Sequence, residues 1–164
     1  MKKQITLTLV MCGTFLFSTH FLLADENEKA KNAPELETAS PSTLQSINLD
    51  YQKKVKPIFE AKCFDCHSKN TVYPWYYKVP GIKQLMDSDI EEGLEHMDMT
   101  NGFPFAGHHP SAQKQLEELD EVLEENDMPP LQYKLMHWNS KLTPADKAVI
   151  LDWIENSTKA IKPK

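Results

Sequence analysis

The sequence contains few cysteines and fewer basic than acidic residues, and both features limit the kinds of chemistry and of partner that it can support. Three cysteines occur in 164 residues, and Cys12 lies in an N-terminal apolar stretch, so a single closely spaced pair remains beyond it. One such pair excludes a disulfide-stabilised scaffold. The 18 basic residues include Lys2 and Lys3, which leaves 16 beyond residue 24 against 24 acidic residues. A chain without a basic stripe cannot neutralise many phosphates, and we expect no nucleic acid among its partners.

The sequence also lacks the alternating pattern of β-strands and any internal repeat. Its apolar residues recur at helical spacing, and Thr143 before Pro144 is a typical N-cap signature. This pattern predicts an all-α, cytochrome-c-like fold of four to five helices. The expected helices are one near residues 51–62 that is kinked by Pro57, then 82–97, 111–125 and one that follows Thr143 with the apolar stripe Val149, Ile150, Trp153 and Ile154.

The first residues have the features of an export signal. Lys2 and Lys3 precede an apolar stretch over residues 5–23, and Ala24 provides a small residue for cleavage. We therefore expect residues 1–24 to be a signal peptide, with an uncleaved membrane anchor as the alternative. Residues 25–46 are polar and predict a flexible, disordered linker. The folded domain is expected to cover residues 47–160.

The most informative motif is Cys63-Phe64-Asp65-Cys66-His67. The pattern C-x-x-C-H is typical of covalent c-type haem attachment. Two thiols three residues apart on a helical turn can each add to one haem vinyl group, and the imidazole that follows can bind the iron. The motif predicts one haem c, attached to Cys63 and Cys66, with His67 as the proximal ligand.

Two other chemistries use the same residue types. A thioredoxin-like dithiol needs a βαβ context, which the helical pattern does not provide. A structural zinc site needs four ligands, so His108 or His109 would have to complete the set. The sequence contains no second C-x-x-C and no H-x₃₋₅-H spacing, and haem is therefore the favoured interpretation.

The sixth iron ligand is expected to be Met128. Electron-transfer cytochromes commonly place a methionine opposite the histidine. Pro129 favours an extended backbone at Met128, and Pro130 stiffens the segment further. An open sixth site and a bis-histidine haem are the alternatives. The other methionines considered are Met86, Met97, Met99 and Met136, and the histidines considered are His96, His108, His109 and His137.

An aromatic loop follows the C-x-x-C-H motif. Tyr73 and Trp75 are candidates for the wall of a haem pocket, since an apolar shell tunes the reduction potential. An ordinary packed loop is the alternative interpretation of the same residues.

The flanking motifs resemble those of the bacterial single-haem cytochromes known as the haem-binding domain family. The matching residues lie between 55 and 156 and are Cys63–Ser68, Asn70–Tyr76, Met128-Pro129-Pro130, Tyr133, His137-Trp138, Leu142-Thr143 and Trp153. The resemblance implies a cytochrome-c-like fold whose first and last helices pack together, with Phe59 and Trp153 at the contact. It also implies that Met128 is the distal ligand.

These observations predict a periplasmic electron carrier rather than an enzyme. A haem bound by both His67 and Met128 has no free site for substrate. The alternatives are a haem peroxidase-like enzyme and a redox- or gas-sensing module, because both need an open sixth site. The expected partner is a redox protein, and the membrane is a partner only if the leader remains uncleaved and tethers the chain to the inner membrane.

Overall fold

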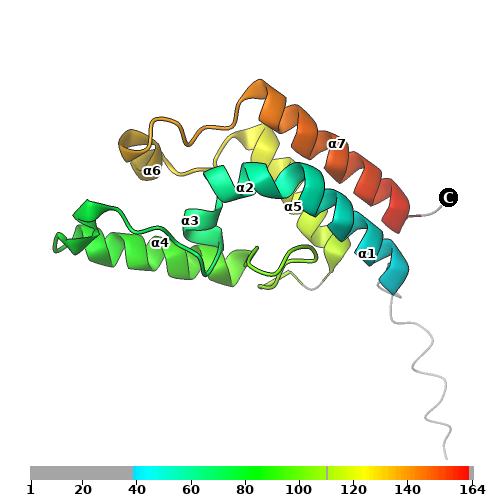
Figure 1. Cartoon of the computed structure of the whole chain (residues 1–164), viewed down its shortest axis with the longest axis horizontal. Helices are drawn as coiled ribbons and strands as arrows, with labels where there is room; N and C mark the ends of the chain where they lie inside the picture. Colours follow the sequence, from blue (N-terminus) through cyan, green and yellow to red (C-terminus); the bar gives the residue numbers. More distant parts are fainter. Residues whose placement is uncertain (1–38, 110, 163–164) are drawn as a thin grey trace, which may run out of the picture. The chain divides into compact units, whose positions relative to one another are not determined.

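The computed structural model of the chain describes residues 39–109 and 111–162 (Figure 1). Its elements are α1 (Pro41–Asp50), the π-helical η2 (Tyr51–Val55), α2 (Lys56–Lys62), α3 (Phe64–His67), the 3-10 helix η3 (Trp75–Lys78), α4 (Ile82–His96), α5 (Ala112–Glu125), α6 (Leu131–Met136) and α7 (Pro144–Ile161). The predicted all-α fold is confirmed, and these residues contain no β-strand. With α1 to α2 counted as one continuous helix, six α-helices are present. Two of the six, α3 and α6, are too short to show a clear apolar period, which is why the sequence indicated four to five. The predicted signal peptide lies outside the described residues.

The first helix begins earlier than the sequence pattern suggested. Ser40 is its N-cap and accepts a hydrogen bond from the Thr43 backbone N–H at 3.1 Å, and Pro41 occupies the first turn. Leu44 packs against the core and Ile47 is buried. Residues 41–46 of the predicted 25–46 linker are therefore helical, because two apolar side chains reach the domain core from a polar segment.

Pro57 interrupts the regular helix as predicted. It lies at the start of α2, directly after the π-helical turn η2. Proline has no N–H to donate within a helix. The wider turn lets the Lys56 N–H bond to the Tyr51 carbonyl, five residues earlier, and buries both Tyr51 and Val55 completely.

The first and last helices pack together, and α1 lies beside α7 (Figure 1). The Trp153 ring centroid is 5.6 Å from that of Tyr51, and its indole N–H donates to the Ile47 carbonyl at 3.3 Å. Tyr51 also packs against Phe59, at 6.0 Å between ring centroids. Phe59 and Trp153 thus belong to one core cluster, with Tyr51 in contact with both.

Helix α7 has the capping arrangement that its sequence predicts. Thr143 Oγ1 accepts from the Asp146 N–H at 3.1 Å, and Asp146 Oδ2 accepts from the Thr143 N–H at 2.8 Å. This reciprocal pair satisfies two backbone donors and fixes the start of the helix. Among the described helices, none has the length and apolar content that crossing a membrane requires.

Candidate functional site

The junction of α2 and α3 gathers the three residues of the C-x-x-C-H motif. Cys63 ends α2 by donating its N–H to the Phe59 carbonyl at 2.8 Å. The Cys63 carbonyl then accepts from the His67 N–H at 2.9 Å and closes the single turn of α3. Cys63, Cys66 and His67 are thereby held on one helical turn, the arrangement that the motif spacing predicted.

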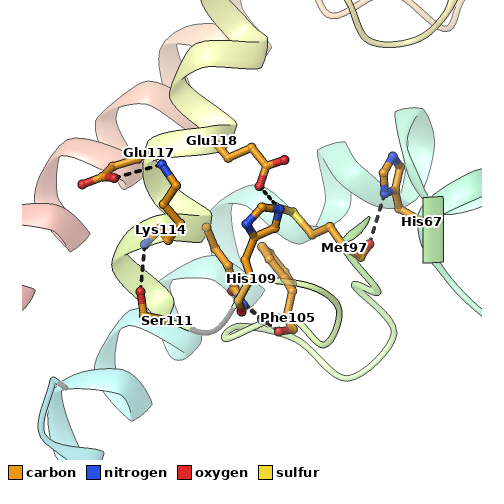
Figure 2. Close-up of polar contacts among 9 residues, drawn as sticks. His67, Met97, Phe105, His109, Ser111, Lys114, Glu117 and Glu118 are labelled. Atoms are coloured by element: carbon orange, nitrogen blue, oxygen red, sulfur yellow. Dashed lines mark hydrogen bonds and ion pairs between the residues drawn. The ribbon is translucent and has the colours of Figure 1, made fainter. Parts of the chain in front are cut away.

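The imidazole of His67 is held in a defined orientation. Its Nδ1 lies 3.1 Å from the Met97 carbonyl oxygen, a contact that Figure 2 marks by a dashed line. Because a carbonyl can only accept, Nδ1 carries the proton. Burial lowers the pKa of His67, although backbone hydrogen bonds to Met97 and Gly93 oppose this shift. The neutral ring therefore keeps a lone pair on Nε2, which is the form that binds a metal.

Helix α4 passes very close to α3 at Gly93. A β-carbon placed at this position would lie 2.7 Å from the Cys66 carbonyl oxygen. Two backbones can approach this closely only where a side chain is missing. Gly93 was not singled out from the sequence, because a glycine inside a helical pattern does not indicate which partner approaches it.

A pocket of about 420 Å³ opens beside these residues, and its lining includes Cys63, Cys66, His67 and Met128. Most of its remaining contact surface is apolar and comes from several helices. The apolar lining includes Phe59, Met97, Met99, Leu119, Val122, Leu123, Leu142 and Ile150. Burial raises the pKa of Cys63 to about 12 and that of Cys66 to about 11. Both side chains are therefore neutral thiols at neutral pH.

The predicted aromatic wall does not line this pocket. Trp75 is 82% exposed, and Tyr73 packs against Tyr77 with 4.2 Å between ring centroids. Phe59 and Tyr133 are the aromatic rings in the pocket lining, and the Tyr133 hydroxyl donates to Asp65 Oδ2 at 2.7 Å. Neither Tyr73 nor Trp75 is among the residues that line the pocket, and a role for them beside bound haem stays a prediction.

The candidate histidines occupy different places. Of the four, His96 alone is part of the pocket lining. His137 is held outside it: its Nε2 lies 2.9 Å from the Tyr76 hydroxyl and its Nδ1 lies 3.2 Å from the Tyr133 carbonyl. Its ring also stacks on Tyr133, at 3.9 Å between centroids. With both nitrogens engaged, His137 is a structural residue here and not a free ligand.

The methionines separate into two groups. Met97, Met99 and Met128 line the pocket, whereas Met86 and Met136 do not. Met97 accepts from His67 through its carbonyl, and the Met99 N–H donates to the His67 carbonyl at 2.7 Å. Met97 and Met99 are therefore attached to the His67 segment itself, while Met128 comes from the connection between α5 and α6.

The donor set in this pocket suits haem. It combines a neutral imidazole with a free Nε2, a thioether and a largely apolar wall, which are the groups that hold haem iron in cytochromes. Two neutral thiols lie on the same lining. A closed zinc site would instead gather four nitrogen or sulfur ligands around one point, and the histidines 108 and 109 do not line the pocket.

Comparison with known proteins agrees with this geometry. A segment of the chain is 34% identical over 96 residues to the cytochrome c peroxidase Ccp of Escherichia coli (strain K12). The match covers 58% of this chain and 21% of that protein, so the chain spans about a fifth of its length. No solved structure matches the chain. Residues 19–156 match the model of the haem-binding domain. The chain is therefore a member of the haem-binding domain family and binds haem.

Proposed function

We propose that this protein is an electron-transfer cytochrome that carries one haem c. The observation that carries the proposal is one pocket whose lining includes Cys63, Cys66, His67 and Met128, with the Nδ1 of His67 engaged by the Met97 carbonyl and its Nε2 left for iron. Cys63 and Cys66 would hold the haem by adding their S–H groups across its two vinyl groups. His67 would be the proximal ligand and Met128 the distal one.

When bound, the haem supplies one-electron chemistry, because its iron changes between the ferric and ferrous states. The protein residues hold and tune it. The Met97 carbonyl orients the His67 ring and increases the basicity of its Nε2. The apolar lining excludes water, which disfavours the more highly charged ferric state.

Met128 is the best distal ligand among the three methionines of the pocket. The backbones of Met97 and Met99 are hydrogen-bonded to His67, so these two side chains start from a segment that is held directly beside the proximal ligand. Met128 starts from a separate segment, and Pro129 restrains its backbone. A thioether on the iron raises the reduction potential and fills the sixth site.

A peroxidase-like enzyme is the second candidate. The name of the E. coli relative favours it. Peroxidase chemistry needs a vacant sixth site, so the occupancy of that site separates the two proposals. A redox- or gas-sensing module would need the same vacancy.

Replacing Met128 by alanine is expected to open the sixth site. The oxidised protein should lose its thioether-to-iron charge-transfer band, the reduced protein should bind carbon monoxide, and the midpoint potential should fall because the thioether no longer stabilises the ferrous state. Met136→Ala is the matched control, since Met136 is exposed and does not line the pocket. Carbon monoxide binding to the unmodified protein would instead support the enzyme or sensor.

We also propose that the protein works in the periplasm and exchanges electrons with another redox protein. The support is the signal-like segment of residues 1–24. Covalent attachment also suits an exported protein, because the haem cannot be lost by dissociation. Fractionation of cells that express the full chain tests the location. Crosslinking in the native periplasm followed by identification of a haem or flavin protein tests the partner.

A further inference from the structure

A second group of ligand-type side chains lies at the edge of the haem pocket. His96 ends α4, His109 lies in the loop that follows it, and Glu118 is on α5. One donor atom from each side chain lies within 4.8 Å of the other two. Two imidazoles and one carboxylate at this spacing are the ligand set of open zinc sites.

Hydrogen bonds attach the loop that carries His109 to both α4 and α5. The His108 N–H donates to the Glu95 carbonyl at 3.0 Å, next to His96. Gln115, one helical turn before Glu118, is buried and donates from Nε2 to the carbonyls of Phe105 at 2.8 Å and His109 at 3.2 Å. The three ligand-type side chains are thus brought together by backbone contacts that do not depend on their own attraction.

Gly107 allows this close approach. Its φ is +131°, and a β-carbon there would lie 2.5 Å from the His96 carbonyl oxygen. Only glycine readily adopts this positive φ, and only glycine lacks the β-carbon that would meet the carbonyl. The loop can therefore press directly against the C-terminal end of α4, where His96 lies.

Two atoms of the group are buried without a regular hydrogen bond. His109 Nε2 and Glu118 Oε2 are inaccessible to solvent and have no hydrogen-bond partner of regular geometry within residues 39–109 and 111–162. They contact each other as an ion pair at 2.5 Å, which Figure 2 marks by a dashed line. Buried polar atoms of this kind are normally satisfied. Two ligand atoms at about 2.0–2.2 Å from one tetrahedral ion stand roughly 3.3 Å apart. A cation would therefore replace the direct contact and bind the lone pair of a neutral imidazole and the charge of the carboxylate together.

We propose that His96, His109 and Glu118 bind a divalent first-row transition metal, with Zn²⁺ as the representative ion. Imidazole ligands favour zinc, copper or nickel over calcium and magnesium, which prefer an all-oxygen shell. Three protein ligands leave a fourth position for water. The inference holds whether Met128 fills the sixth iron position or that position is open, and it requires that His96 and His109 are not bound to the iron.

The metal would lie close to the iron site. His96 and Glu118 also line the haem pocket, and His96 directly precedes Met97, whose carbonyl orients His67. A bound cation should disfavour the ferric state, because the oxidised haem carries one more positive charge than the reduced haem. Zinc binding is therefore expected to raise the midpoint potential.

The test is equilibrium dialysis of the haem-loaded protein against Zn²⁺, followed by metal and iron analysis. In this form covalent attachment has consumed the thiols of Cys63 and Cys66, which would otherwise bind zinc. We expect one zinc per haem iron in the unmodified protein, and at least tenfold weaker binding in Glu118→Gln and in His109→Asn. Glu117→Gln is the matched control: it removes the same charge from the neighbouring residue, which contacts Lys114 instead (Figure 2).

The redox titration provides a second readout. Saturating Zn²⁺ should raise the midpoint potential of the unmodified protein and of Glu117→Gln, and leave that of Glu118→Gln unchanged. Substoichiometric binding, or equal binding by Glu118→Gln, would show that His109 and Glu118 form only an ion pair and would overturn the proposal. An unchanged haem spectrum and circular dichroism in each variant show that the loss is not unfolding. Failure of haem attachment is seen separately in the iron analysis.

Discussion

Replacing Trp153 by alanine is expected to lower the free energy of unfolding by about 3–5 kcal/mol. Trp153 is 2% exposed on α7 and packs against Tyr51 and Phe103, with centroid distances of 5.6 and 5.2 Å. The substitution leaves a cavity between the first and last helices and also frees the Ile47 carbonyl from its indole donor. A domain of this size should lose roughly 10 °C or more in melting temperature.

Trp138→Ala provides a matched control for this experiment. Trp138 is 87% exposed, so the same change of side chain should alter the stability by less than about 0.5 kcal/mol. Thermal and urea unfolding of the haem-loaded proteins measure both values. Equal effects of the two substitutions would mean that the α1–α7 contact does not hold the fold together.

Adding one methyl group at Gly93 is expected to damage the haem site. In an exposed helix, glycine to alanine stabilises by about 1 kcal/mol. Here the new β-carbon meets the Cys66 backbone oxygen at 2.7 Å, and a backbone atom cannot rotate away. We expect Gly93→Ala to lower the free energy of unfolding by about 1–3 kcal/mol, as overpacking does.

The same substitution should reduce the yield of attached haem, because α3 must move and carries both Cys66 and His67. Haem per protein is measured by absorbance against total protein. Ser88→Ala is the control in the same helix, since Ser88 is exposed and gains helix propensity without a new contact. A Gly93→Ala protein that is more stable and fully loaded would contradict the proposed approach of α4 to α3.

Local signals explain what the sequence predicted well. Thr143, Pro144 and Asp146 are a helix start whose hydrogen bonds involve only neighbouring residues. The helical spacing of Ile150, Trp153 and Ile154 likewise places all three in the core. The C-x-x-C-H turn is likewise closed by bonds within five residues. Such features need no knowledge of the rest of the fold.

The sequence did not predict features that depend on contacts between residues far apart in the chain. Ser40 and Pro41 carry the same start signal as Thr143 and Pro144, but the polar residues around them suggested a linker, and the decisive factor is the packing of Ile47 against the core. Within the aromatic loop, Tyr73 packs against Tyr77 and Trp75 against Tyr76, and the sequence does not distinguish such contacts from contacts with a pocket. The approach of His109 to Glu118 arises from a loop docked by Gln115, which no spacing in the sequence reveals.

The most direct test of the account is whether haem is covalently bound to Cys63 and Cys66. The full chain is produced with the haem-attachment machinery, denatured, and examined by pyridine haemochrome spectroscopy and by mass spectrometry of the peptide that contains residues 63–67. The account predicts a haem c spectrum and a peptide heavier by one haem, with both signals lost in the Cys63→Ser, Cys66→Ser double variant. Haem that separates from the denatured chain, or an unmodified peptide, would contradict it.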